Sequence, residues 1–596
     1  MRLRLLLPAL LVPFFVHVGP EPAAAQDRAE FAWHCPEFTL LVYERVTAPG
    51  DNRWSSDTAR YLVPRGQIDA DGNWHTGYSG KDEVGELVLR LASIVPGKAP
   101  GRTKTWTREF DSAAIVLGRD WLPDRLQVTG TYISTQDGMV KYRIEAKGED
   151  LEAAAPSKDP HADPDKQIGL TTADLECEFD AGKGWLRRVQ GTVMCPGTGI
   201  PPPPGRQAPA RDISFALSEH TTLADRAAFE AEVKSAIAAG LRRLDATKHE
   251  WDKRPGHAAL AAYTMLQCGR KATDPAVMQA LDCMVPPEGK TPFVQQYHAA
   301  AQILAIEAKY IGDEERRQVL AGQSPSEFRR ALSQTDRAQV EAALDYLARS
   351  QVTGQNGVWS YGVGIGTAQV PDLSNGQFAV MAMAAAARCG VALPQGLVRA
   401  TGESLLTFQQ AQGPLLKRAL SRDRKGNWVR AKEAVPCRGF TYYQQGPTAG
   451  ATYGSITGAG VCCALLLLDM HEGMDDERKR AEFTGTKPKE WREALTAAAE
   501  SGLAWLERNW TVNANPHYAH LTPTHYCCYL YSLERVGALA QTQVIGPHEW
   551  YTEGAMTLLQ KQSKEGGWGQ FEDTAFALLF LSRATTPTRS SPITGR

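Results

Sequence analysis

The sequence predicts an α+β multidomain protein, in which a β-rich antiparallel domain precedes a mainly α domain that forms an (α/α)6 toroid. Three observations lead to this prediction. Up to about residue 218, many apolar residues alternate with polar ones, which is typical of half-buried strands. From Leu223 onward the apolar residues recur with a period of about 3.6, which is typical of helices. Beyond Leu223, helical segments of two kinds follow each other repeatedly, which indicates a ring or a solenoid.

The N-terminus has the layout of a secretory signal peptide. Arg2 and Arg4 precede an apolar run at residues 5–18, and three alanines end at Ala25. We expect cleavage after Ala25, so that residues 1–25 are removed and the protein is exported to a periplasm or to the extracellular space.

Charge and hydropathy argue against two classes of partner. The formal net charge is -2, which gives no electrostatic basis for binding nucleic acid. The longest apolar run after the signal peptide, residues 461–468, is much shorter than the roughly 20 residues that span a bilayer. We therefore expect no integral membrane segment after removal of the signal peptide.

The 11 cysteines do not read as a disulfide framework. The adjacent pairs Cys462-Cys463 and Cys527-Cys528 lie within apolar helical segments, where cysteine usually acts as a small buried hydrophobe. Export would permit one bridge in the N-terminal domain, and the sequence leaves its pairing open among Cys35, Cys177 and Cys195.

Residues 26–218 are expected to form a curved antiparallel sheet. Residues 180–184 read as a hairpin loop. Residues 150–166 and 196–209 read as exposed loops, because they are rich in proline and charge or in proline alone. We find no catalytic constellation in this domain. The predicted strands cover residues 40–47, 126–134, 140–146, 173–179, 185–193 and 212–217.

Residues 219–585 are expected to form the toroid, and residues 586–596 a flexible tail. Segments of the first kind carry charges on one face, at residues 239–244, 280–282, 343–347, 401–406, 501–506 and 553–559. Segments of the second kind are nearly apolar on every side, at residues 257–268, 297–308, 375–389, 455–470, 524–536 and 573–584. A helix that is apolar on every side must be buried on every side. The pattern therefore predicts six mixed helices outside six apolar ones.

Two segments of the first kind are followed by a glutamine, a glycine and a tryptophan. These residues are Gln351, Gly357 and Trp359, and then Gln562, Gly566 and Trp568. They resemble the glutamine–tryptophan repeats of squalene-hopene cyclases: the second copy has the family spacing Q-x3-G-x-W, and the first has two extra residues. The wider resemblance, over roughly residues 225–585, is to the terpenoid cyclase and protein prenyltransferase superfamily. It implies a structural role in which each glutamine lies at an outer-helix end and each tryptophan packs against it.

The proton donor of the cyclases is not intact. In that family the acid belongs to a D-x-D-D string at the start of an inner helix, and this string is absent here. The nearest strings read Asp-Leu-Ser-Asn from Asp372 and Gln-Phe-Glu-Asp up to Asp573, which place Ser374 and Glu572 at the donor position. The alternative interpretation makes both aspartates helix caps, with the glutamate beside the helix dipole. The candidate catalytic residues are therefore Glu572, Asp573 and Asp372.

The metal signatures of the superfamily are also incomplete, so we expect no cofactor. In the string at residues 475–479, Lys479 replaces the last acid of a magnesium-binding D-D-x-x-D. His525 matches the histidine of a prenyltransferase zinc site, but the Asp-x-Cys partner is missing. We expect this histidine to line the mouth of the ring instead. The cavity-lining candidates are His525, Tyr526, Ser455 and Thr457.

Other proteins built as helical rings suggest two further comparisons. The G-C-G-E-Q string of thioester domains is absent. Glycosidases and polysaccharide lyases use carboxylates and aromatic platforms at the open end of the ring, and the carboxylates here would be Asp372 with Glu572 or Asp573. The candidate platforms are Trp251, Trp359, Trp428 and Trp568. A basic insert at residues 412–438 is expected to project from one end of the toroid, as a solvated excursion or as a patch for an anionic partner.

Two functions remain. The first is a non-catalytic binding or scaffold protein, because the acid, magnesium and zinc signatures are not intact. The alternative is an enzyme, terpenoid cyclase-like or polysaccharide-acting, that uses the central cavity with Glu572 as acid. The partner would be an apolar or polymeric ligand in that cavity, or a protein. An open, aromatic-lined cavity would favour the enzyme or a ligand-binding role, and a ring closed by side chains would favour the scaffold.

Overall fold

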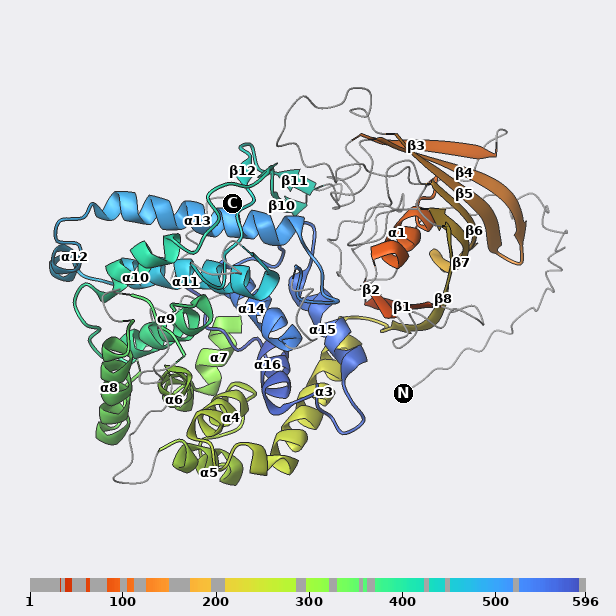
Figure 1. Ribbon diagram of the computed structural model, residues 1–596. Coiled ribbons are helices and arrows are strands. Elements are labelled where there is room, and N and C mark those ends of the chain that lie inside the picture. Colours follow the sequence, from red (N-terminus) through yellow and green to blue (C-terminus); the bar gives the residue numbers. More distant parts are fainter. Residues whose placement is uncertain are drawn as a thin grey trace, which may run out of the picture.

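The computed structural model describes residues 33, 38–45, 60–64, 83–96, 104–111, 125–149, 172–194, 210–285, 296–320, 330–352, 357–361, 370–422, 428–444, 451–517 and 525–588. The predicted signal peptide lies outside these residues, as do the two loops predicted at 150–166 and 196–209. Strands occupy the N-terminal half and helices the C-terminal region, so the α+β class is confirmed (Figure 1). The last long strand ends at Thr222 and the next helix begins at Arg226, so the boundary predicted at residue 218 falls inside a strand.

The N-terminal half contains one antiparallel sheet with the strand order β2-β1-β8-β7-β6-β5-β4-β3. Each predicted strand is present, and residues 181–184 connect β6 to β7 as predicted. The two edge strands, β2 and β3, and the helix α1 are not predicted. An edge strand pairs on one side only, which leaves a weaker pattern in its sequence. The strands are β1 (Thr39–Arg45), β2 (Arg60–Pro64), β3 (Thr105–Asp111), β4 (Arg125–Gln136), β5 (Met139–Glu149), β6 (Thr172–Asp180), β7 (Trp185–Met194) and β8 (Ala210–Thr222).

One face of this sheet packs against α1 (Glu83–Ala92). Side chains from the rest of the domain satisfy the carbonyls at its C-terminal end, which have no partner within the helix. The Tyr142 hydroxyl donates to the carbonyl of Ala92 at 2.5 Å, and the Trp33 indole donates to that of Ser93 at 2.8 Å. Cys177 is a free thiol buried in the same core, which excludes it from a bridge. Cys35 and Cys195 lie outside the described residues.

Six helices of the C-terminal region contact one another in cyclic order, each with the next and the last with the first. They match the predicted segments of the second kind. Burial on every side is clearest in α11, where each residue from Gly454 to His471 is buried. Among the described residues this is the one helix long and apolar enough to cross a membrane, and it lies inside the protein. In order, the six are α4 (Pro255–Gln267), α6 (Gln296–Lys309), α9 (Leu373–Arg388), α11 (Gly454–Glu472), α14 (Tyr526–Leu539) and α16 (Phe571–Leu581).

Helices of the first kind pack against these six and alternate with them along the chain. Three short helices lie in the connections, and Asp475 caps the last of them by accepting from the Arg478 N–H at 2.7 Å. The outer helices are α3 (Arg226–Ala246), α5 (Pro275–Cys283), α8 (Gln334–Arg349), α10 (Leu397–Leu406), α13 (Pro488–Arg508) and α15 (Trp550–Lys561). The connecting helices are the 3-10 turn Lys248–Glu250, α7 (Asp313–Leu320) and α12 (Asp476–Glu482).

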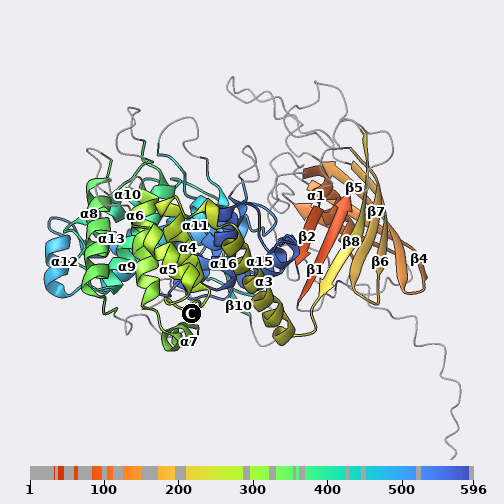
Figure 2. The same cartoon turned by 90° about the horizontal axis from the view of Figure 1, so that it is seen from below.

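The sheet and the helices share a core where β1 and β2 contact α15 (Figure 2). Phe38 stacks on Phe229 of α3 with a centroid distance of 5.0 Å, and Phe229 meets Tyr551 of α15 edge-on at 6.1 Å. Along β1, Leu40 and Val42 belong to the helical core, whereas Leu41 and Tyr43 belong to the core around α1. Because successive side chains of a strand point to opposite faces, β1 contributes residues to both cores.

Part of the basic insert lies along the outer helix α13. The insert contains two small two-stranded antiparallel sheets, in which β9 (Leu415–Leu416) pairs with β12 (Val435–Pro436) and β10 (Ala419–Arg422) with β11 (Trp428–Arg430). Buried Glu507 of α13 accepts a hydrogen bond from the Ala419 N–H at 3.0 Å, and Arg418 and Arg430 lie 3.9 and 3.6 Å from its carboxylate. A buried carboxylate needs such partners, so it anchors the insert.

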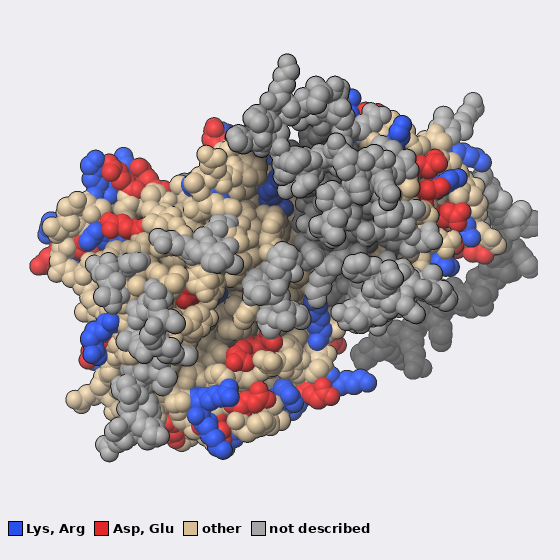
Figure 3. All heavy atoms as spheres, viewed as in Figure 1, with Lys and Arg blue, Asp and Glu red and all other residues tan. Residues whose placement is uncertain are grey.

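Two surface features complete the fold. On the face shown in Figure 3, positive and negative side chains are interspersed over the helical domain, in agreement with the net charge of -2. The predicted flexible tail begins within a packed segment, because buried Thr588 donates to the carbonyl of Leu539 at 2.8 Å. Residues 589–596 lie outside the described residues.

Candidate functional site

The two glutamine–tryptophan pairs make matching contacts at the ends of outer helices. The indole of Trp359 donates to the carbonyl of Leu347 on α8, and that of Trp568 to the carbonyl of Leu558 on α15, both at 2.8 Å. Both rings are buried. In the second pair, Gln562 also donates to the carbonyl of Ala236 on α3 at 2.9 Å, which ties the last outer helix to the first. The side-chain Oε1 of Gln351 accepts from the Gly357 N–H at 2.5 Å.

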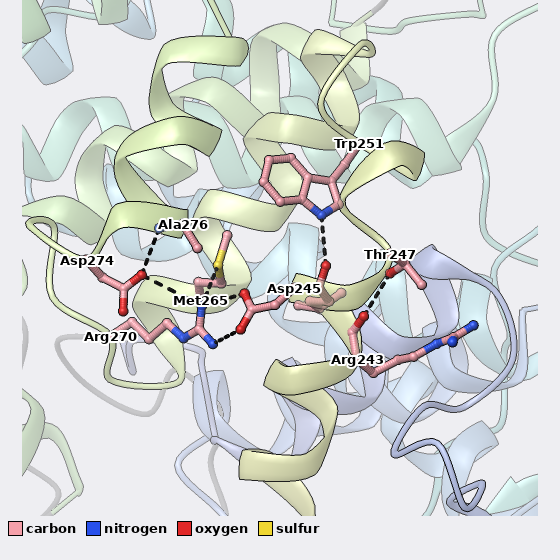
Figure 4. A network of polar contacts seen from close by, with 9 residues as sticks. Arg243, Asp245, Thr247, Trp251, Met265, Arg270, Asp274 and Ala276 are labelled. Atoms are coloured by element: carbon pink, nitrogen blue, oxygen red, sulfur yellow. Dashed lines mark hydrogen bonds and ion pairs between the residues drawn. The ribbon is translucent and has the colours of Figure 1, made fainter.

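Trp251 makes the same kind of contact at the end of α3, which the sequence pattern did not reveal. Its indole donates to the carbonyl of Leu244 at 3.1 Å (Figure 4). Only 1% of its side chain is exposed, and Trp359 and Trp568 are 0% and 7% exposed. A sugar platform needs an exposed ring face, so the platform prediction is wrong for these three tryptophans. The Trp428 side chain lies outside the described residues.

Asp372 is the N-cap of α9. Its Oδ1 accepts from the Asn375 N–H at 2.9 Å and lies 2.5 Å from the Ser374 hydroxyl. The Asn375 side-chain amide donates to Oδ2 at 2.8 Å. Burial raises the pKa of Asp372, and the hydrogen bonds from Ser374 and Asn375 oppose this rise. Asp372 is thus both the cap of α9 and the carboxyl whose pKa is raised.

Three tyrosine hydroxyls extend this site toward solvent. The Tyr297 hydroxyl donates to the Ser374 hydroxyl at 2.8 Å, and that of Tyr442 lies 2.9 Å from it. The Tyr361 hydroxyl lies 3.2 Å from that of Tyr442 and 3.4 Å from that of Tyr297, and its side chain is 52% exposed. Burial raises the pKa of Tyr297 and Tyr442, and the charge of Asp372 adds to this effect. We call these five residues the tyrosine cluster: Tyr297, Tyr361, Asp372, Ser374 and Tyr442.

The chemistry of the tyrosine cluster is hydrogen bonding. Each hydroxyl both donates and accepts one or more hydrogen bonds, which suits the binding of a polar ligand. Ser374 is the residue that the resemblance to the cyclases would place at the position of their acid, and a serine hydroxyl supplies no acidic proton. The sequence pattern did not single out the three tyrosines, and the adjacent Tyr442 and Tyr443 were the only hint.

The carboxylates at the start of α16 lie in a different surrounding. The helix begins at Phe571 with Gln570 as its N-cap residue, so Asp573 is not the cap. Its carboxylate accepts instead from the Gln570 N–H, as an acid in the third helical position does in a capping box. Burial raises the pKa of Asp573.

Glu572 is 45% exposed, and its Oε1 lies 3.3 Å from Nε2 of His257 on α4. The histidine is oriented by a 3.1 Å hydrogen bond between its Nδ1 and the carbonyl of Glu250, and it stacks on Phe571 at 5.1 Å. A cyclase acid requires a dry apolar surrounding, which a half-exposed carboxylate beside an imidazole does not have.

Three of the four cavity-lining candidates hold loops in place. Asn515 joins Ser455 through its side chain, accepting from the Ser455 N–H and donating to its hydroxyl, both at 2.9 Å. The Thr457 hydroxyl accepts from the Phe440 N–H at 3.2 Å. The Tyr526 hydroxyl donates to a loop carbonyl at 2.6 Å. His525, the fourth, is exposed at the residue before α14, with a left-handed φ of 77°.

Side chains join helices that are not neighbours in the cyclic order of contacts. Arg535 of α14 donates to Oε1 of Gln377 on α9 at 2.9 Å and contacts Sδ of Met381 at 2.8 Å. Tyr531, also on α14, joins its hydroxyl to that of Tyr263 on α4 at 3.2 Å. The guanidinium lies over the Tyr531 ring, 4.6 Å from its centroid, and all five side chains are buried. We call these five residues the axial cluster: Tyr263, Gln377, Met381, Tyr531 and Arg535.

Arg535 is the residue that the sequence reasoning missed although a signal existed. Together with Glu534 before it, it is one of two adjacent charged residues in a largely apolar segment, and charged residues are almost never fully buried without a partner. Within the described residues, none of the ion pairs includes it. The Gln377 side-chain oxygen, the Tyr531 ring and the charge of the neighbouring buried Glu534 therefore surround this fully buried guanidinium.

The described residues contain no group of three or more His, Cys, Asp or Glu arranged to hold a metal ion. No family model matches the chain, and comparison with curated proteins and with solved structures gives no match.

Proposed function

We propose that this chain is an exported protein whose helical domain is an (α/α)6 toroid resembling the terpenoid cyclase and prenyltransferase superfamily, and that it acts as a non-catalytic binding or scaffold protein. The cyclic contacts of the six buried helices support the toroid. So do the matching contacts of Trp359 and Trp568 at outer-helix ends.

One observation carries the functional side of the proposal, namely the axial cluster. A cyclase must enclose a long isoprenoid, and ligand pockets of that kind hold roughly 300–1,000 Å³. Here Arg535, Tyr531 and Tyr263 reach across the ring and hydrogen bond to their partners. An isoprenoid could enter only by displacing a buried guanidinium from its partners, and the site would then present a charge to an apolar chain.

The inner-helix N-termini support the same conclusion. Ser374 at the donor position is bound to a carboxylate and to tyrosine hydroxyls, and Glu572 is half-exposed beside His257. Neither group has the environment of a strong acid. The tyrosine cluster, with Tyr361 exposed, is instead suited to hold a polar ligand or a partner protein at the surface.

The test is incubation of the mature protein with squalene, followed by native mass spectrometry of the protein and product analysis of the lipid. We expect no cyclised product and no squalene retained by the wild-type chain. The variant Tyr531→Ala removes one side chain of the axial cluster and leaves the Arg535 guanidinium facing a space that water fills, so it should also retain no squalene. Conversion of squalene by wild type, abolished in Glu572→Gln, would overturn the proposal. Conversion that persists in Glu572→Gln would also overturn the proposal, and it would mean that another residue is the acid.

A further inference from the structure

A cavity of about 230 Å³ lies at the end of the ring opposite the inner-helix N-termini. It is formed by the loops that follow α4 and α6, together with the first turn of α7. Four cationic side chains line it, and the single carboxylate among the lining residues is that of Asp313. The volume is below the roughly 300–1,000 Å³ of pockets for drug-sized ligands, so the cavity suits a smaller molecule.

Two of the four cations are already balanced by carboxylates outside the lining. Arg270 binds Asp245 of α3 through two hydrogen bonds of 2.8 and 2.5 Å, as Figure 4 shows. Lys309 binds Asp336 of α8 at 2.8 Å. Because a carboxylate already balances each of them, Arg270 and Lys309 need no anionic ligand. The inference below therefore does not depend on them.

Arg316 differs from these two. Its guanidinium donates to the carbonyls of Gln267 and Leu266, at 2.9 and 2.5 Å, and to the Gln267 side chain at 3.2 Å. The group is therefore held rigidly at the end of α4. Of the ion pairs found among the described residues, none includes Arg316. A guanidinium has five N–H donors, so about two remain after these three bonds.

Lys271 supplies the second available cation. It pairs with Asp313, but the two side chains are 66% and 68% exposed. An exposed ion pair contributes about 0–1 kcal/mol to stability, so a more highly charged anion in the cavity can replace Asp313 as the partner of the lysine.

We propose that this cavity binds a small oxyanion, a phosphate group, between the rigid Arg316 guanidinium and the Lys271 ammonium. The planar fork of arginine matches the geometry of phosphate oxygens, and lysine adds a mobile point charge. Asp313 opposes the anion and lowers the affinity. The site is independent of the function proposed above, because it shares no residue with the tyrosine cluster or the axial cluster.

The experiment is calorimetric titration of the full mature chain with inorganic phosphate at constant ionic strength, with chloride as the reference anion. Lys271→Gln should weaken binding about tenfold, since it removes one charge-assisted partner. Asp313→Asn should tighten binding severalfold, because it removes the one lining carboxylate. Lys489→Gln, at an 88% exposed position on α13, is the matched control and should bind as wild type does.

Opposite effects of Lys271→Gln and Asp313→Asn support the site even if Arg316→Gln, which loses the bonds to the end of α4, fails to fold. Two results would overturn the inference. One is the absence of saturable phosphate binding by wild type. The other is equal phosphate affinity of wild type, Lys271→Gln and Asp313→Asn.

Discussion

Replacing Trp359 with alanine should lower the free energy of unfolding of the helical domain and should leave its surface unchanged. The side chain is 0% exposed, and its indole donates at 2.8 Å to the carbonyl of Leu347 near the end of α8. Removal of this side chain both empties a packed space and leaves a carbonyl at the helix end without its partner.

The structure sets the size of the effect. Truncation of a fully buried tryptophan to alanine costs about 3–5 kcal/mol, from lost transfer free energy and the cavity that remains. Trp359→Phe keeps most of the ring and removes the indole donor, so it should cost about 1–2 kcal/mol. The difference between the two variants separates packing from the hydrogen bond.

Urea unfolding followed by circular dichroism measures these costs as shifts of the midpoint at constant slope. Leu415→Ala is the control, because this side chain is 71% exposed in the insert, and its effect should stay within about 0.5 kcal/mol. A loss below about 1 kcal/mol for Trp359→Ala would refute the structural role of the repeat tryptophan.

Three further predictions follow from buried carboxylates. Burial raises the pKa of Glu534 to about 7, above the roughly 4.3 of an unfolded chain, so its contribution to stability is complete below about pH 4 and is lost as the pH rises through about 7. Relative to Glu534→Gln, wild type should therefore lose roughly 3 kcal/mol of unfolding free energy between about pH 4 and pH 8 in urea titrations. Asp372→Ala should cost about 1–2 kcal/mol in the same assay, because α9 loses its cap, whereas Asp372→Asn should cost less. Glu507→Gln should loosen the insert at residues 412–438, because buried Arg418 loses its carboxylate, and should accelerate tryptic cleavage there at least severalfold.

Each of these predictions has an opposing outcome. Parallel pH profiles of wild type and Glu534→Gln would show that the carboxyl titrates as an exposed group does. Equal costs of Asp372→Ala and Asp372→Asn would remove the capping interpretation. Unchanged cleavage in Glu507→Gln, compared with the exposed-site control Lys489→Gln, would mean that the two small sheets hold the insert without the ion pairs.

The sequence determined the order and type of the main elements. A period of about 3.6 is a local property, and a helix such as α11 that is apolar on all sides requires burial on all sides wherever it lies. The spacing of Gln562, Gly566 and Trp568 likewise belongs to one helix end and its turn. For these reasons the predicted helical segments correspond to observed helices. The strands with a clear alternation are also present, whereas the edge strands β2 and β3 escaped prediction.

The tertiary structure alone decided which side chains meet. Arg535 and Gln377 are 158 residues apart, and their contact depends on how two helices are rotated and packed, which periodicity does not specify. The tyrosine cluster likewise joins α6, α9 and two connecting segments. Because α16 begins at Phe571, Asp573 is an acid in the first turn of the helix and not its cap. Local patterns thus determine the elements, and the long-range packing of side chains determines the site.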